Sequence, residues 1–120
     1  MHNYKKLNVW QNAIELVYEI YMVSKQFPKD ELYGLTQQLR RSAVSIPSNI
    51  AEGSGRRTAR DFNNFLTIAY ASSFELETQL LIANKLQYIH QQEFETICDK
   101  LILVQKRLFK LKESIDPNSI

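Results

Sequence analysis

Four stretches of this chain carry apolar residues at the spacing of an α-helix, and this periodicity constrains the fold more than any other feature. The stretches cover residues 7–27, 35–52, 58–86 and 92–114. The chain holds only 3 Gly and 3 Pro, and because turns consume these residues, long helices are favoured over many short strands. Short links make consecutive helices run in opposite directions. We therefore predict an all-α fold, an antiparallel up-down-up-down four-helix bundle that forms a single domain over residues 1–120.

Rows of apolar residues predict the hydrophobic core of this bundle. In the first helix two adjacent rows cover about half of the surface, which is wider than a single core stripe requires. The third helix is apolar on several sides near its start, which indicates burial against another subunit as well. The predicted rows are Val9, Ala13, Leu16, Ile20 and Val23 beside Trp10, Ile14, Val17 and Tyr21; Leu35, Leu39, Ala43, Ile46 and Ile50; Phe62, Leu66, Ala69, Ser73, Leu76, Leu80 and Ala83; and Phe94, Ile97, Leu101, Val104, Leu108, Leu111 and Ile115.

The second helix contains a proline and ends in two glycines. Pro47 cannot donate a backbone hydrogen bond, so the carbonyl of Ala43 loses its partner. We predict a kink and not a stop at Pro47, because the apolar row continues to Ile50. Gly53 and Gly55 are predicted to form a left-handed C-terminal cap and a tight exit from the helix.

One side of the same helix is polar and carries Ser45, Ser48, Asn49 and Glu52. Short polar side chains satisfy backbone groups near a proline or a helix end. A structural role is therefore favoured for these residues, together with Pro47 and Gly53. In the alternative interpretation, Asn49 and Glu52 form a small polar pocket.

Arginines bracket the proline-containing segment 42–55 on both sides, at Arg40, Arg41, Arg56, Arg57 and Arg60. The last three lie at the start of the third helix, where Thr58 followed by Asp61 resembles a capping box. Free backbone N–H groups and the helix dipole make that position positive, so arginines there are mildly unfavourable for stability but suit a phosphate. The five arginines are our candidate nucleic-acid-binding residues. Alternatively, acidic residues of this chain or of another subunit neutralise them.

The formal net charge is only +2, but the charges are unevenly distributed. Residues 35–60 carry five basic residues against one acidic residue, and residues 100–113 carry the same ratio. Between them, residues 61–99 hold six acidic residues and one lysine. Such an uneven distribution is suited to binding an anionic partner, or to pairing of opposite charges within or between subunits.

The sequence offers no catalytic or metal-binding motif. His2 and His90 are far apart, and neither has further ligands at metal-binding spacing. Cys98 falls beside the apolar row of the fourth helix, so packing is favoured over nucleophilic chemistry. A Gly-rich phosphate loop, a nucleophile elbow and the Glu-x-x-His pair of di-iron bundles are all absent. We predict a protein that is not an enzyme and uses no metal or cofactor.

Aromatic residues are spread along the chain rather than set among basic ones. Trp10, Tyr18, Tyr21, Tyr33 and Tyr70 could stack on nucleic-acid bases. Most of them lie on or beside the core rows, so packing in the core is the favoured role. The chain has no apolar run of about 18 residues, no recognisable signal peptide and a single cysteine, which predicts a cytoplasmic protein without membrane contact.

Several short motifs stand out along the chain: KLNVWQNA at residues 6–13, FP at 27–28, ELYGL at 31–35, QLRRSAVSIPSNIAEG at 38–53, FLTIA at 65–69 and ELE at 75–77. Through these motifs the chain resembles the 23S rRNA intervening-sequence protein family, also called four helix bundle proteins. The motifs span nearly the whole chain. One departure is Ala71, where the family commonly has glycine before the serine, which predicts a slightly looser helix contact.

The resemblance implies a four-helix bundle that assembles as a homopentamer, encoded in bacterial genomes and often within ribosomal RNA genes. The chain is also similar to the accessory variability proteins of diversity-generating retroelements, which are basic pentamers that associate with nucleic acid and a reverse transcriptase. These partners are therefore expectations from the resemblance. It implies no established biochemical activity.

Two functional hypotheses follow. In the first, a non-enzymatic homo-oligomer binds RNA or DNA non-specifically through its arginines, and ring symmetry strengthens the binding by avidity. In the second, the chain is a structural or protein-interaction module whose arginines form salt bridges between subunits, for example from Arg40 and Arg41 to Glu75 or Glu77 of a neighbour. The first hypothesis requires that the arginines are exposed together on one face. The second requires that they form salt bridges at contacts between subunits.

Overall fold

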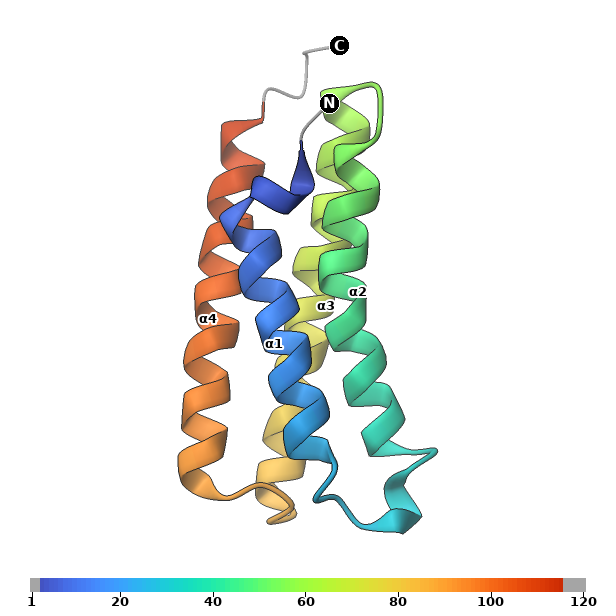
Figure 1. Ribbon diagram of the computed structural model, residues 1–120, viewed down its shortest axis with the longest axis vertical. Helices are drawn as coiled ribbons and strands as arrows, with labels where there is room; N and C mark the ends of the chain where they lie inside the picture. The colour runs from blue at the N-terminus through green and yellow to red at the C-terminus, as the bar shows by residue number, and fades with distance from the viewer. Residues whose placement is uncertain (1–2, 116–120) are drawn as a thin grey trace.

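The computed structural model describes residues 3–115, and within this range it contains helices and no strand. Two single-turn 3₁₀ helices, η1 (Tyr4–Lys6) and η2 (Lys29–Glu31), accompany four long helices. These are α1 (Asn8–Ser24), α2 (Leu35–Ser54), α3 (Ala59–Lys85) and α4 (Gln91–Ser114). Figure 1 shows them side by side, with the chain turning back after α1, α2 and α3. The prediction of an all-α four-helix bundle is confirmed, and the helices begin and end within three residues of the predicted bounds.

The predicted core rows form one hydrophobic core. Every member of the α2 and α3 rows is buried, as are the central four residues of the α4 row. In α1 only one of the two apolar rows is buried, because the second row points toward the groove between α1 and α2. Trp10 and Val17 of that second row are half-buried, whereas Ile14 and Tyr21 are exposed.

The pair of helices with the most extensive contact is α2 and α3. Small side chains allow the close approach, and the Ser45 and Ser72 hydroxyls lie 2.8 Å apart across the contact. Ala71 is exposed, so it does not take part in this contact. The prediction that Ala71 loosens the helix contact was therefore wrong, because the neighbouring Ser72 and Ser73 are the residues that face the bundle.

The end of α2 differs from the prediction. The helix continues through Pro47 to Ser54, and neither Gly53 nor Gly55 has a positive φ angle. The predicted left-handed glycine cap was wrong, because Gly55 keeps a right-handed conformation and its N–H group donates to the Glu52 carbonyl at 3.2 Å. A kink at Pro47 stays a prediction.

Gly53 is required for helix packing instead. A Cβ atom at this position would lie 2.7 Å from Cβ of Phe65 and 3.0 Å from Cδ1 of Phe62. Only a residue without a side chain lets α2 approach α3 this closely.

Both ends of α3 are closed by hydrogen bonds. At its start, the Thr58 hydroxyl accepts from the Asp61 N–H group at 3.1 Å, which confirms the predicted N-cap. At its end, Gln87 has a φ of 64°, and the Gln87 and Tyr88 N–H groups donate to the carbonyls of Asn84 and Ala83. This is the left-handed closure that glycine usually provides, and here glutamine adopts it.

Candidate nucleic-acid interface

The structure does not bring the five candidate arginines onto one face. Arg40 turns toward α1, where its Nε donates to the Ser24 hydroxyl at 2.8 Å. Its guanidinium also lies 4.7 Å from the ring centroid of Tyr21. The Arg40 side chain is half-buried and holds α2 against α1, so its geometry is that of a structural residue.

Replacing Arg40 by alanine is expected to lower the free energy of unfolding by about 1–2 kcal/mol, because a charge-assisted hydrogen bond and a cation–π contact are lost. Nucleic-acid affinity should stay unchanged. The matched control is Arg41→Ala, the next residue, which is exposed and should change stability by less than about 0.5 kcal/mol. Urea unfolding followed by circular dichroism measures both, and equal losses for the two variants would contradict the structural role of Arg40.

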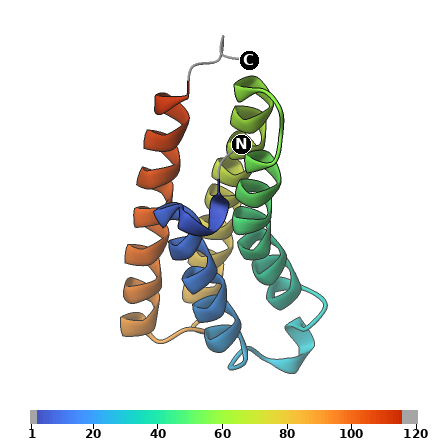
Figure 2. The ribbon, with the colours of Figure 1, turned by 45° about the horizontal axis from the view of Figure 1, so that its top comes forward.

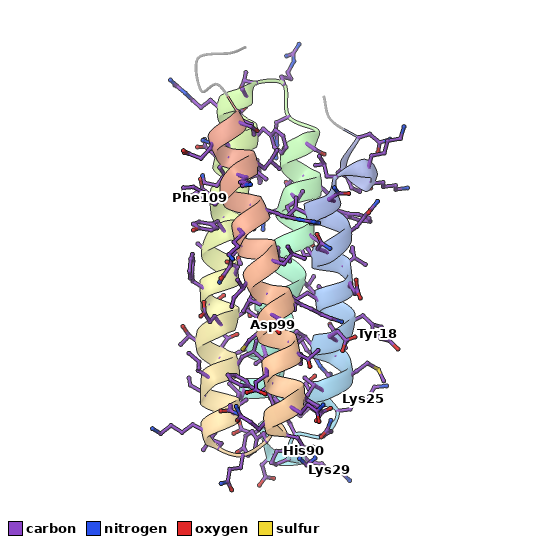
Figure 3. All side chains as sticks on the ribbon, turned by 90° about the vertical axis from the view of Figure 1, so that its left-hand side faces the viewer. Tyr18, Lys25, Lys29, His90, Asp99 and Phe109 are labelled. Carbon is purple, nitrogen blue, oxygen red and sulfur yellow. The ribbon has the colours of Figure 1, made fainter. Side chains whose placement is uncertain are left out.

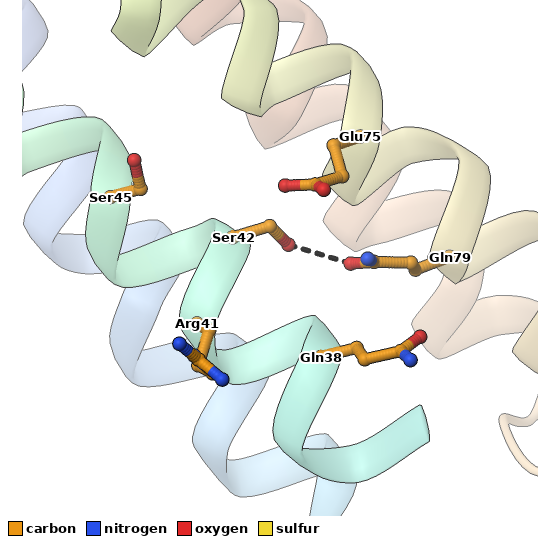
Figure 4. Close-up of a pocket in the computed structure, with 6 residues that line it drawn as sticks. All are labelled: Gln38, Arg41, Ser42, Ser45, Glu75 and Gln79. Atoms are coloured by element: carbon orange, nitrogen blue, oxygen red, sulfur yellow. Dashed lines mark hydrogen bonds between the residues drawn. The ribbon is translucent and has the colours of Figure 1, made fainter. Parts of the chain in front are cut away.

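Arg41, about 100° further around α2, lines a polar groove of about 460 Å³ between α2 and α3. The other lining residues are Gln38, Ser42, Ser45, Glu75 and Gln79 (Figure 4). The Ser42 and Gln79 side chains are hydrogen-bonded at 2.6 Å across the groove. Glu75 lines the same groove as Arg41, so this arginine has an acidic neighbour. The two side chains do not form an ion pair within residues 3–115.

The other three arginines lie together at the turn between α2 and α3. Arg56 pairs with Glu52 at 3.0 Å and stacks over the Phe65 ring at 4.6 Å. Arg57 and Arg60 are exposed. Neutralisation by an acidic residue of this chain is therefore seen for Arg56 and not for Arg57 or Arg60 within residues 3–115.

This turn belongs to a strongly basic end of the bundle. Arg107 of α4 donates to the Asn12 side chain of α1, and Lys112 of α4 donates to Asn63 of α3 at 3.2 Å. These hydrogen bonds bring the last turns of α4 beside the first turns of α1 and α3, at the end of the bundle that is tilted toward the viewer in Figure 2. We define the basic end by its nine basic side chains, which are Lys5, Lys6, Arg56, Arg57, Arg60, Lys106, Arg107, Lys110 and Lys112.

Most of these cations are not used by the fold. Within residues 3–115, the side chains of Lys5, Lys6, Arg57, Arg60, Lys106 and Lys110 form no ion pair or hydrogen bond, and all six are exposed. Only Glu52, Asp61 and Glu113 carry negative charge in this half of the bundle, made up of residues 3–14, 47–71 and 103–115. Its formal net charge is therefore +6.

The other half of the bundle has the opposite sign. Residues 15–46 and 72–102 carry nine acidic and six basic residues, a formal net charge of −3. One of these cations, Lys100, is held between Glu15 and Glu19 of α1 at 3.5 and 3.2 Å. Charge is thus separated along the long axis of the molecule.

Only three of the nine basic side chains, those of Arg56, Arg57 and Arg60, are among the site residues predicted from the sequence. The basic run at residues 100–113 and the lysines at 5 and 6 are missing from that prediction, although their positive charge is visible in the sequence. The predicted up-down topology could have identified these residues. In such a bundle the start of the first helix, the second connection and the end of the fourth helix lie at the same end.

The predicted structural motif is engaged within the chain. Asn49 donates to the Ser45 carbonyl at 2.8 Å, and Glu52 pairs with Arg56. Pro47 and Gly53 are buried. These contacts agree with the structural interpretation of the segment rather than with a polar pocket at Asn49 and Glu52.

Cys98 and the residue types that bind metals are the groups whose chemistry the structure describes. Burial, with added repulsion from Glu77 and Asp99, raises the pKa of the Cys98 thiol, which makes it a poorer nucleophile. Residues 3–115 contain no group of three or more side chains that could hold a metal ion. His2 lies outside the described residues. No helix in residues 3–115 is long and apolar enough to cross a membrane.

The aromatic residues are less buried than predicted. Tyr33 is 87% exposed and Tyr18 is 62% exposed, and Tyr21 is exposed as well. Trp10 and Tyr70 are only half-buried. The prediction of core packing was wrong for the three tyrosines, because the bundle uses a single row of α1 and because Tyr33 lies in the connection before α2.

Four long helices around one core, with a basic end and no metal-binding cluster in the described residues, define a small four-helix-bundle protein. The chain belongs to the 23S rRNA-intervening sequence protein family, whose model matches residues 5–110. It is similar to a solved structure of a protein with unknown function from the S23 ribosomal protein family of Bacteroides thetaiotaomicron. The two structures superpose with a TM-score of 0.82, and the sequences are 25% identical. The match covers 88% of this chain and 99% of the other. No curated protein matches the chain. Neither of the two similarities is to a known enzyme.

Proposed function

We propose that this chain is a non-enzymatic protein that binds RNA or DNA in the cytoplasm through the phosphates, using its basic end. The observation that carries the proposal is the group of six exposed cations that the fold leaves without a partner in residues 3–115. Contacts with phosphates supply most of the affinity in non-specific nucleic-acid binding. A protein that binds in this way needs a solvent-exposed surface on which positive charges are concentrated.

The shape of the basic end supports binding that is independent of sequence. It is the blunt end of a bundle whose two short dimensions are 25 and 21 Å, whereas the major groove of B-DNA is only about 12 Å wide. Side chains on such a surface reach the sugar-phosphate backbone rather than the edges of the bases. Backbone contacts position a protein but carry no sequence information.

We further propose that the chain acts as a homo-oligomer, and that this oligomer is the pentamer that the family resemblance implies. An aromatic group on the outside of α3 and α4 supports self-association. The rings of Tyr70 and Phe74 lie 4.9 Å apart, the rings of Tyr70 and Phe109 lie 6.4 Å apart, and Phe74 and Phe109 are exposed. Repetition of the basic end around a ring would increase the affinity for a long polyanion.

A salt titration tests the proposal. Fluorescence anisotropy of a labelled 20-base-pair duplex should show binding at about 50 mM salt, with log K falling linearly against log salt. Contact with about five phosphates gives a slope near −4.5, so that affinity drops about 10²- to 10³-fold by about 200 mM. Light scattering in the same buffers gives the oligomer mass, so that avidity and contact number are measured separately. A lack of binding at low salt, or affinity that does not change with salt, would rule out the proposal.

The second candidate is a structural or protein-interaction module. Its specific support is that Arg40 and Arg56 are already engaged within the chain. This function predicts an oligomer that binds neither RNA nor DNA and that dissociates as salt screens contacts between arginines and acidic residues of neighbouring subunits.

A further inference from the structure

A second surface lies beside the basic end and is apolar rather than charged. It is a groove of about 290 Å³ between α1 and α2, lined chiefly by Tyr4, Trp10, Ile14, Val17, Val44 and Pro47. We call it the Trp10 groove. Its volume is close to that of the smallest pockets that hold organic ligands, so it has room for one planar base rather than for an extended segment.

The groove is left open by the chain. Trp10 and Val17 are half-buried, and Ile14 and Val44 are exposed. The surplus apolar row of α1 is therefore directed into this groove, and nothing in residues 3–115 covers it. An open apolar cleft on a small domain indicates a site that a partner fills.

One wall of the groove is fixed by hydrogen bonds. The Tyr4 and Trp10 rings meet edge to face, with their centroids 5.2 Å apart. The 3₁₀ turn that carries Tyr4 is held at its central residue, because the Lys5 N–H group donates to the Asn3 side chain at 3.2 Å and the Lys5 carbonyl accepts from the Gln11 side chain at 2.9 Å. The aromatic corner is thus ordered before any ligand arrives, which reduces the entropy lost on binding.

Positive charge adjoins this corner. Lys5 and Lys6 follow Tyr4 directly, are exposed, and belong to the basic end. Proteins that bind single-stranded nucleic acid combine aromatic or apolar surfaces, on which bases stack, with nearby cations that follow the phosphates. A duplex cannot use the groove, because its bases are already stacked and paired.

We propose that the Trp10 groove receives an unpaired base of a single-stranded nucleic acid whose phosphates lie on the basic end. This inference rests on the proposed function and extends it from nucleic acid in general to single strands. Stacking accepts every base, so the preference is for strandedness and not for sequence.

The chain contains one tryptophan, and therefore Trp10 fluorescence reports on the groove directly. A 15-nucleotide oligothymidine and a blunt duplex of the same length are titrated at about 50 mM salt, and binding is followed independently by anisotropy of a label on the nucleic acid. The single strand should change the Trp10 emission in proportion to binding. The duplex should bind with no change in emission.

Substitutions in the groove should weaken single-strand binding alone. Trp10→Leu is expected to cost about 10-fold in affinity for oligothymidine, in line with the loss of one stacked base, and to leave duplex affinity unchanged. Val44→Gln tests the facing wall, on α2, without touching the core, because Val44 is exposed. Tyr18→Leu is the matched control: it removes an exposed ring from α1, labelled in Figure 3, that lies outside the Trp10 groove and should alter neither affinity.

The possible failures are distinguishable. Equal binding of both nucleic acids with unchanged Trp10 emission overturns the groove proposal but leaves the proposed function intact. Absence of all binding overturns both. If the Trp10 emission instead changes with protein concentration alone, a second copy of the chain occupies the groove and the base-binding proposal is wrong.

Discussion

Replacement of Gly53 by alanine is expected to lower the free energy of unfolding by about 2 kcal/mol. The added Cβ would lie 2.7 Å from Cβ of Phe65 and 3.2 Å from the Phe62 carbonyl oxygen, and neither atom is the end of a flexible side chain. Overpacking of this kind costs about 3 kcal/mol, and alanine returns about 1 kcal/mol because it favours a helix more than glycine does. Urea unfolding followed by helical circular dichroism measures the net loss.

Gly55→Ala is the matched control for this substitution. The same methyl group at Gly55 would meet only the Glu52 carbonyl oxygen at 3.6 Å, an ordinary contact, and the φ angle of −89° suits alanine. The free energy of unfolding should therefore stay within about 0.5 kcal/mol of that of the original chain. Any change should be a small increase, because alanine has fewer conformations than glycine in the unfolded state. If both glycines tolerate alanine equally, the close approach of α2 and α3 at Gly53 is not a constraint on this fold.

Reversal of three charges at the basic end is expected to abolish most nucleic-acid binding. The triple variant Arg57→Glu, Arg60→Glu and Lys110→Glu changes three exposed side chains that have no partner in residues 3–115. It removes up to three phosphate contacts and adds repulsion, so affinity at about 50 mM salt should fall more than about 100-fold, and the slope against salt should become shallower by about 2–3 for a duplex. Anisotropy titrations at several salt concentrations measure both quantities.

The control for charge reversal uses the opposite end of the bundle. Lys25, Lys29 and Lys85 are exposed, and the first two are labelled near the lower end in Figure 3. Their conversion to glutamate changes the net charge by the same amount but leaves the basic end intact. Affinity should then fall only slightly through long-range repulsion. Equal losses in the two triple variants would show that overall charge, and not the basic end, determines binding.

Much of this fold could be predicted from the sequence, because burial in a helical bundle repeats with the helical period. Rows such as Leu39, Ala43 and Ile46 are buried as their spacing indicates. The predictions about glycine failed for a different reason. A glycine before a turn looks like a cap, whereas Gly53 is required by a contact with α3, and only the packed pair of helices shows this contact.

The candidate site was predicted in part. Arg56, Arg57 and Arg60 lie together as their sequence positions suggest, but Arg40 is used by α1 through Ser24. That contact could not be foreseen from the periodicity of one helix. The contribution of α4 to the basic end likewise depends on which helix ends meet in space, and therefore on topology rather than on local sequence.

The separation of charge along the bundle has a consequence for encounter kinetics. A formal +6 in one half and −3 in the other give the molecule a large electric dipole moment, although its overall charge is small. A polyanion attracts one half and repels the other, so the molecule turns its basic end forward before contact. Such steering raises the rate of productive collisions and is weakened by added salt. In the proposed complex the acidic half makes no phosphate contact, but its charge still orients the approach.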